Sequence, residues 1–186
     1  MDNTRQALMA SIERLKQALA NYRQREGFDD RVPAPRPPAD EAEIVAYERH
    51  LGLRLPESYR IFLQLHNGYD WLAYPGHMLS IRSVMPGGEW YEDICEWKRD
   101  TVEYGSGEVL DGIVIATVDE ATNWKLYLDP NRPSRQGELT VVEWTPNESY
   151  EYADLIEFFD ELTLTWSEED EDGEEIDEDE EDEDED

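Results

Sequence analysis

The sequence has few of the residues from which disulfides, metal sites and membrane spans are built. Cys95 is the only cysteine among 186 residues, which excludes an internal disulfide and any metal cluster made of several cysteines. The first residues, MDNTRQALMA, lack the apolar core of a signal peptide. No apolar run approaches the roughly 20 residues that cross a bilayer. We therefore expect a soluble protein of the cytoplasm.

Sequence signatures of catalysis are also missing. The three histidines, His50, His66 and His77, do not have the spacing of metal ligands, and no HExxH motif occurs. Neither Gly87-Gly88 nor Gly105-Ser106-Gly107 has the spacing of a phosphate-binding loop. Carboxylates are so numerous that choosing any two as an acid–base pair would be arbitrary. We expect a protein that is not an enzyme and has no catalytic, metal-binding or cofactor-binding residues.

Basic residues are scarce: sixteen Lys and Arg stand against 47 Asp and Glu, which gives a formal net charge of −31. Seventeen of the acidic residues lie within residues 168–186, and we predict that residues 167–186 form a disordered acidic tail. The rest of the chain keeps thirty acidic residues against the sixteen basic ones, a balance of −14. This charge repels nucleic acid and anionic membranes and attracts a basic protein, although solubility alone also accounts for a moderately acidic body.

Two segments precede the main domain. Residues 1–31 are predicted to form an amphipathic helix, running from Thr4 to Glu26 with Asn3 as its N-cap. Its apolar stripe consists of Leu8, Ile12, Leu15, Leu19 and Tyr22. We expect the stripe to pack on the same domain rather than on a second copy of the chain. Residues 32–38, VPAPRPP, are predicted to be an extended linker, because proline disfavours helices and central strands.

Residues 43–68 are the most clearly patterned stretch of the chain. Asp40 and Glu43 resemble a capping box at the start of a helix, and Gly52 is suited to end that helix in a left-handed conformation. Pro56 is suited to the first turn of a second helix, which Asn67-Gly68 would end. The pattern predicts two short helices joined by a turn.

This stretch resembles a known family, the SUKH superfamily, which is named for yeast cell-wall regulators of the Smi/Knr type. The matching residues are Glu48, Leu51, Gly52, Leu55, Pro56, Tyr59, Phe62, Leu63, Asn67 and Gly68. Members often have a second glycine next, where this chain has Tyr69-Asp70-Trp71 and therefore a bulkier predicted loop. The resemblance implies a fold in which helices pack on a mainly antiparallel sheet.

The expected fold class is α+β, with a single SUKH-like domain at residues 39–166 between the N-terminal helix and the acidic tail. Alternating or β-branched residues predict strands at residues 78–84, 113–118, 124–128 and 139–144. Helical periodicity predicts further helices at residues 89–102 and 149–162. A long turn is predicted at residues 129–137.

The resemblance also implies a function. Bacterial members of the superfamily are typically cytosolic immunity proteins that bind and block a cognate toxin, which is frequently a nuclease or another enzyme that acts on nucleic acid. Such toxins tend to be basic, in agreement with the acidic composition of this chain. Two other hypotheses stay open: a regulatory scaffold of the Smi/Knr type that recruits partners through the acidic tail and the proline linker, and an acidic chaperone for basic clients.

Partner-binding residues are predicted in two places. Aromatic side chains beside a carboxylate are typical of interface hot spots, and the predicted helix at residues 89–102 has an outward acidic face. The predicted partner-binding residues are Tyr69, Asp70, Trp71, Tyr74, Glu89, Glu92, Asp93 and Glu96. The alternative is that the aromatic residues cover the core and the acidic residues only keep the surface solvated. The sequence leaves the oligomeric state open.

Overall fold

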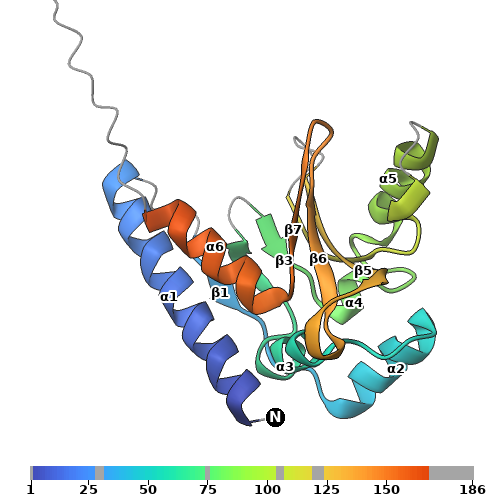
Figure 1. The fold of residues 1–186 in the computed structure, drawn as a ribbon, viewed down its shortest axis with the longest axis horizontal. Helices are drawn as coiled ribbons and strands as arrows, with labels where there is room; N and C mark the ends of the chain where they lie inside the picture. The colour runs from blue at the N-terminus through green and yellow to red at the C-terminus, as the bar shows by residue number, and fades with distance from the viewer. Residues whose placement is uncertain (1, 28–31, 74–75, 104–106, 119–123, 168–186) are drawn as a thin grey trace, which may run out of the picture.

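The protein is built around one seven-stranded antiparallel sheet in the computed structural model (Figure 1). The strands are neighbours in chain order, so the sheet is a meander with β1 and β7 at its edges. The strands are β1 (Ala34–Pro35), β2 (Tyr69–Ala73), β3 (Gly76–Met78), β4 (Ile113–Thr117), β5 (Lys125–Pro133), β6 (Leu139–Trp144) and β7 (Ser149–Tyr152). The structure describes residues 2–27, 32–73, 76–103, 107–118 and 124–167.

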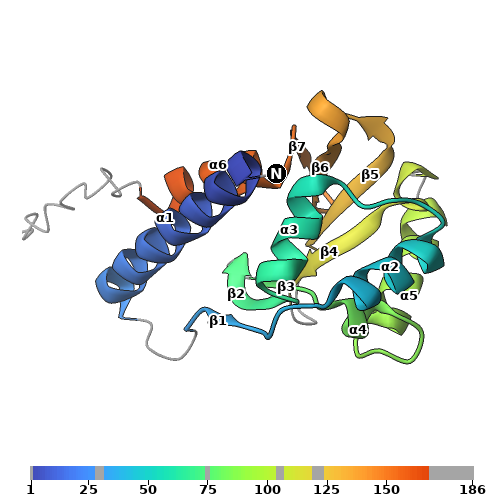
Figure 2. The same cartoon turned by 90° about the horizontal axis from the view of Figure 1, so that it is seen from below.

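Helices cover both faces of this sheet, and the predicted α+β class is confirmed. They are α1 (Asp2–Glu26), α2 (Glu41–Leu51), α3 (Glu57–Leu65), α4 (Ile81–Val84), α5 (Tyr91–Glu103) and α6 (Leu155–Ser167), with short 3-10 turns η1 (Gly107–Val109) and η2 (Arg135–Gly137). α1, α3 and α6 lie over one face of the sheet and α5 lies over the other (Figures 1 and 2). The larger core fills the first side, and a smaller cluster around Trp97 and Tyr127 fills the second.

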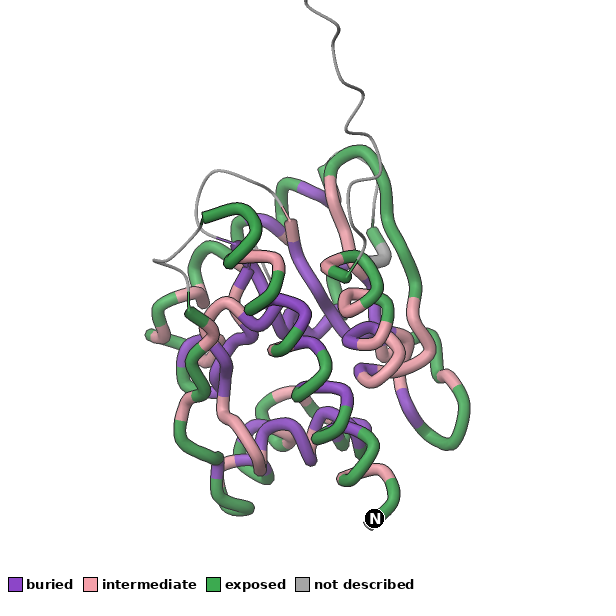
Figure 3. The backbone as a smooth tube through the Cα atoms, turned by 90° about the vertical axis from the view of Figure 1, so that its left-hand side faces the viewer, coloured by how far each residue is buried: buried purple, intermediate pink, exposed green. Residues whose placement is uncertain are grey.

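α1 packs along α6 on the outside of the larger core (Figure 1). Leu8, Leu15 and Leu19 are fully buried, and Ser11 Oγ donates a hydrogen bond to Asp160 Oδ1 of α6 at 2.5 Å. Buried and exposed stretches therefore alternate along the chain on this side of the molecule (Figure 3). The prediction that the apolar stripe packs on its own domain is confirmed. The helix already includes Asn3, so the predicted N-cap is wrong.

The residues that resemble the SUKH pattern cap and connect α2 and α3. Asp40 Oδ1 accepts a hydrogen bond from Glu43 N at 2.8 Å, and Gly52 has a φ of 73°, as predicted for the two ends of α2. Asn67 Nδ2 donates to Glu43 Oε1 at 3.1 Å, while Asn67 Oδ1 accepts from Ile81 N at 2.8 Å. Asn67 thus fixes α4 against the two helices.

The start of α3 is capped from a distant part of the chain. Pro56 is the N-cap residue itself and offers no side-chain acceptor. Glu138, just before β6, instead accepts hydrogen bonds from Ser58 N at 3.0 Å and from Ser58 Oγ at 2.5 Å. A carboxylate at this end of a helix also interacts favourably with the helix dipole. The contact ties the two-helix stretch to the sheet.

Two elements near the middle of the chain differ from the prediction. The predicted strand at residues 78–84 is wrong, since β3 ends at Met78 and Ser80 Oγ caps α4 by accepting from Ser83 N at 3.2 Å. The predicted loop Tyr69-Asp70-Trp71 is also wrong, because all three residues lie in β2, where Tyr69 pairs with both β1 and β3 and Asp70 pairs with β1. Hydrogen bonding to neighbouring strands decides the conformation here, and the local pattern of residues does not reveal it.

The C-terminal part of the domain shows a further correction. The predicted strand at residues 139–144 is confirmed as β6, but the predicted helix at residues 149–162 is divided between β7 and the first half of α6. The predicted turn at residues 129–137 is largely wrong, since β5 continues to Pro133 and only η2 remains as a turn. Pairing between β6 and β7 outweighs the helical periodicity of the local sequence. The prediction for α5 at residues 89–102 agrees with its observed range.

Candidate protein-binding site

The last three strands bring aromatic and acidic side chains together on the face of the sheet that α6 covers. Because side chains alternate along a strand, Trp124 shares the face of Leu126, a residue of the larger core. In the register of the sheet, Glu143 lies opposite Leu126, and Tyr150 lies opposite Glu143. Tyr152 follows Tyr150 by two residues and shares its face. The strand register therefore creates this cluster.

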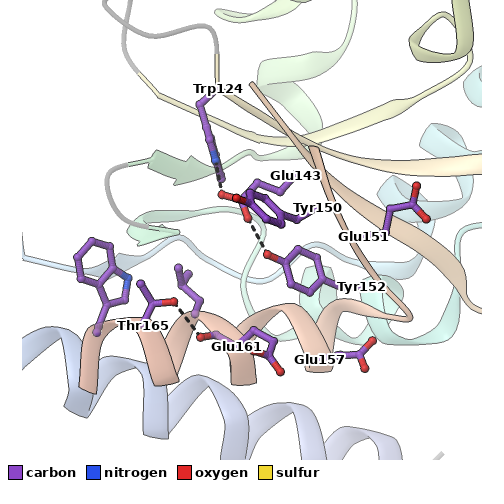
Figure 4. Close-up of a pocket in the computed structure, with 10 residues that line it drawn as sticks. Trp124, Glu143, Tyr150, Glu151, Tyr152, Glu157, Glu161 and Thr165 are labelled. Atoms are coloured by element: carbon purple, nitrogen blue, oxygen red, sulfur yellow. Dashed lines mark hydrogen bonds between the residues drawn. The ribbon is translucent and has the colours of Figure 1, made fainter. Parts of the chain in front are cut away.

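Glu143 is the polar centre of the cluster (Figure 4). Its Oε1 accepts a hydrogen bond from Trp124 Nε1 at 2.7 Å, and its Oε2 accepts one from Tyr152 Oη at 2.7 Å. Hydrogen bonds to a charged acceptor are stronger than neutral ones. Burial, and then the bond to Glu143, raise the pKa of the Tyr152 phenol above its ordinary value of 10.0, so the phenol keeps its proton and donates to Glu143 well into the alkaline range.

One side of α6 forms the opposite wall of a groove (Figure 4). Glu157, Glu161 and Thr165 recur every four residues and so lie on one face of the helix. The groove has a volume of about 600 Å³, within the roughly 300–1,000 Å³ range of ligand sites. It is lined by Trp124, Glu143, Tyr150, Glu151, Tyr152, Glu157, Glu161, Leu162, Thr165 and Trp166. We call it the β7–α6 groove.

Local contacts fix the start and the direction of α6. Asp154 Oδ1 accepts a hydrogen bond from Glu157 N at 2.9 Å, and the Glu157 carboxylate accepts one from Ala153 N. This arrangement resembles a capping box, except that Glu157 reaches the N–H group one residue before Asp154. Near the other end of α6, the rings of Tyr22 in α1 and Trp166 lie 4.7 Å apart. α1 therefore supports the wall that α6 gives to the groove.

The carboxylates of the groove differ in how far they are already neutralised. Glu151 pairs with Arg132, and Glu157 lies 3.7 Å from Arg135. Glu143 is held by two neutral donors, and Glu161 is exposed. Among the described residues that line the groove, there are four carboxylates and no Lys or Arg. The arrangement is suited to hold a cationic group against aromatic rings.

The structure places the predicted residues around position 70 near the opposite edge of the sheet. Tyr69 is only 2% exposed and belongs to the larger core. Asp70 Oδ1 accepts from Arg36 Nη2 at 2.8 Å, and the Trp71 ring lies 4.1 Å from the ring of His77. Asp70 and Trp71 are half-buried and so keep some exposed surface. Tyr74, also predicted to bind a partner, lies outside the described residues.

The second predicted group lies on the outer side of α5 and the turn before it. Its members, which we call the α5 acidic face, are all exposed: Glu89, Glu92, Asp93 and Glu96. Trp97 points inward from the same helix, and its ring lies 5.3 Å from the ring of Trp144. α5 therefore packs over the later strands, whereas Asp70 lies in β2. The structure does not join the two predicted groups into one surface.

The β7–α6 groove was not predicted from the sequence. A helix at residues 149–162 would have removed Tyr150 and Tyr152 from the sheet and so hidden their relation to Glu143. Two signals were present: the alternation of residues 149–152, SYEY, is typical of a strand, and Asp154 three residues before Glu157 marks the start of a helix. Even with these signals, the hydrogen bond from Trp124 to Glu143 depends on the pairing of β5 with β6, which the local pattern of residues does not reveal.

Within the described ranges, no three His, Cys, Asp or Glu side chains gather in a way that could hold a metal ion. The helices of the described part of the chain are not long and apolar enough to cross a membrane.

The sequence matches one known family over most of its length. A sequence model of the SMI1 / KNR4 family (SUKH-1) matches residues 38–171. The matched range includes the α5 acidic face and the whole lining of the β7–α6 groove, while α1 lies outside it. No curated protein matches the chain.

Proposed function

The chain belongs to the SMI1 / KNR4 family (SUKH-1), and from that premise we propose that it is an immunity protein that binds and neutralises a basic bacterial toxin. The observation that carries the proposal is the charge: 47 acidic residues against sixteen basic ones, with exposed carboxylates on α5 and in the β7–α6 groove. Surfaces of opposite charge steer two proteins together and exclude wrong partners. An acidic protein of this kind fits a cationic toxin.

The chain would neutralise the toxin by occupying the surface on which the toxin binds its substrate. An enzyme that acts on nucleic acid needs a positive surface to bind phosphates. An acidic protein seated on that surface excludes the substrate, both by its volume and by repelling the phosphates. We propose that this binding takes place in the cytoplasm and involves no catalysis by the chain itself. The acidic residues at 168–186 speed capture, because their charge acts at longer range than a hydrogen bond.

Co-expression tests the proposal directly. Genes beside the one that encodes this chain are searched for a secreted toxin, and the toxin domain is expressed in cells with and without the chain. We expect the chain to restore growth and to be recovered in a complex with the toxin domain. A variant of the toxin with its basic surface residues changed to glutamine serves as the control and should no longer be bound. Failure of every neighbouring toxin domain to bind would reject the proposal.

A regulatory scaffold is the second candidate, and the acidic run at residues 168–186 favours it. A tail of this kind suits recruitment of several basic partners. The proline linker fits this role less well, since Ala34 and Pro35 pair with β2 and so belong to the sheet. Gene position separates the two candidates: a neighbouring toxin gene supports immunity, and an isolated gene supports the scaffold.

A further inference from the structure

We infer that the β7–α6 groove is the anchoring site for an arginine or lysine side chain on a basic segment of the partner protein. The inference rests on the proposed function for the nature of the partner, and it adds the place and the chemistry of the contact. A groove of about 600 Å³ between a sheet and a helix has room for one long cationic side chain and part of its backbone. The side chains that line the groove favour a cationic side chain as its occupant.

The aromatic residues give the first reason. Trp124, Tyr150, Tyr152 and Trp166 all line the groove, and Tyr150 is 51% exposed. A guanidinium or ammonium group placed over an aromatic ring is attracted by the electrons of the ring. The aliphatic part of an arginine or lysine side chain also packs favourably on such rings. A purely hydrophilic cation, such as a hydrated metal ion, would gain little from these walls.

The carboxylates give the second reason. Glu143 is fixed between two donors, Trp124 Nε1 and Tyr152 Oη, and each carboxylate oxygen can accept more than one hydrogen bond. A guanidinium that enters the groove therefore meets an acceptor that is already oriented. Glu161 supplies a further exposed negative charge from α6, on the opposite wall. Pre-organised partners of this kind lower the cost of ordering side chains on binding.

A second cavity of the chain provides a contrast. It has a similar volume, about 660 Å³, and lies beside α3. Its lining includes Arg54 and Arg60, and the Arg60 guanidinium pairs with both Glu41 and Glu48. The lining also includes Glu41 and Glu57, so its charges balance, and it attracts an incoming cation less than the four carboxylates of the β7–α6 groove do. Charge complementarity therefore points to the β7–α6 groove and not to this cavity.

Other occupants fit the groove less well. The segment that follows α6 starts one residue after Ser167, but seventeen of its nineteen residues are acidic and would be repelled by the groove. A second copy of the chain carries a net charge of −31 and is repelled as a whole. The same acidic segment attracts a basic partner and is attached beside the groove, because Thr165 and Trp166 belong to the lining. A basic segment of another protein is therefore the occupant that fits the groove best.

The test uses the full chain and a fluorescently labelled hexa-arginine peptide. The groove variant Tyr150→Ala with Glu161→Gln removes one exposed ring and one charge, and neither side chain holds the core. The matched control, Tyr91→Ala with Glu92→Gln, removes the same groups from α5. We expect the groove variant to bind the peptide about tenfold more weakly, the combined effect of one cation–π contact and one charge, and the control to change by less than about twofold. An equal loss in both variants would overturn the inference.

An NMR titration and assays with the toxin show separately whether the groove inference or the proposed function is wrong. In an NMR titration, the indole N–H signal of Trp124, assigned with Trp124→Phe, should shift on addition of the peptide; no shift at saturation counts against the groove. If the groove variant protects cells from the toxin as well as the original chain and binds it with the same affinity, the inference is wrong while the proposed function stands. If the peptide binds in the groove but the chain neutralises no toxin, the proposed function is wrong while the groove remains a site for basic segments.

Discussion

The β7–α6 groove and the α5 acidic face are both acidic, but they lie over opposite faces of the sheet and are built in different ways. In the groove, the half-buried carboxylate of Glu143 is held by hydrogen bonds from Trp124, just before β5, and from Tyr152 in β7. On the α5 acidic face, the four carboxylates are exposed on the outer side of the helix and of the turn before it, and Trp97 anchors the inner side. One surface is shaped and the other is only charged.

This difference separates two tasks in binding. An exposed charge acts over about 10 Å at moderate ionic strength, so it guides a partner and raises the association rate. A fixed acceptor among aromatic rings acts only in contact, so it mainly slows dissociation. We therefore expect the α5 acidic face to contribute to capture and the groove to contribute to retention.

The largest effect is expected from a change in α1, which tests whether the stability of α6, and so of the groove wall, depends on its packing against α1. Leu15→Ala removes a fully buried side chain and should lower the free energy of unfolding by about 2–5 kcal/mol, measured by urea denaturation. Amide hydrogen exchange should become faster in α6 than in α5, because α1 packs on α6. The control is Met9→Ala on the same helix, which is 47% exposed and should change stability by less than about 0.5 kcal/mol. If amide exchange became equally faster in α5, the two sides of the sheet would not respond independently, and the prediction would be contradicted.

Alkaline pH provides a second test, of the larger core on the groove side of the sheet. Burial raises the pKa of Tyr47 and Tyr59, both in the larger core, above the ordinary value of 10.0. Above about pH 10 the unfolded chain loses these protons while the folded chain keeps them. The free energy of unfolding is then expected to fall by about 1.4 kcal/mol per pH unit for each tyrosine, and to be unaffected by these groups below that pH. Tyr47→Phe should remove one such contribution, and an unchanged slope would refute the assignment.

The sequence predicts the α2–α3 stretch well because its signals are local. Asp40 and Gly52 act within a few residues of their own positions, at the two ends of α2, where residue type determines geometry. The α5 helix and its inner Trp97 follow from periodicity for the same reason. The family resemblance came from the first of these stretches.

The groove could not be predicted in this way because its parts meet only through strand pairing. Glu143, Trp124 and Tyr150 are unremarkable as single residues, and their contact requires the register of three strands. Tyr69 shows the opposite error: its aromatic character suggested a binding surface, but β2 directs the side chain into the core. The choice of face in a strand depends on tertiary packing, and the sequence around position 70 does not alternate clearly.

Removing residues 168–186 should have a smaller effect, limited to the rate of association. The deletion takes away seventeen acidic residues, so a basic toxin or the hexa-arginine peptide should associate roughly tenfold more slowly at low ionic strength, measured by stopped-flow fluorescence. Added salt should reduce the difference, because it screens charges that act at a distance. The groove variant should instead change the dissociation rate. An association rate that does not change at low salt would remove this segment from the mechanism.

The smallest effect is expected from the α5 acidic face. Glu92→Gln with Glu96→Gln removes two exposed charges, and each exposed pair is worth about 0.2–1 kcal/mol. With about 0.5 kcal/mol for each charge, near the middle of that range, the affinity for the toxin, measured by titration calorimetry at physiological salt, should fall by about fivefold, and the loss should lie in the association rate. Protection of cells from the toxin should persist. If this variant abolishes protection while the groove variant retains it, the order of the two surfaces is reversed: α5 anchors the partner and the groove is peripheral. The two double variants thus decide which acidic surface holds the partner, because the groove variant removes one ring and one charge from one face of the sheet and the α5 variant removes two charges from the other.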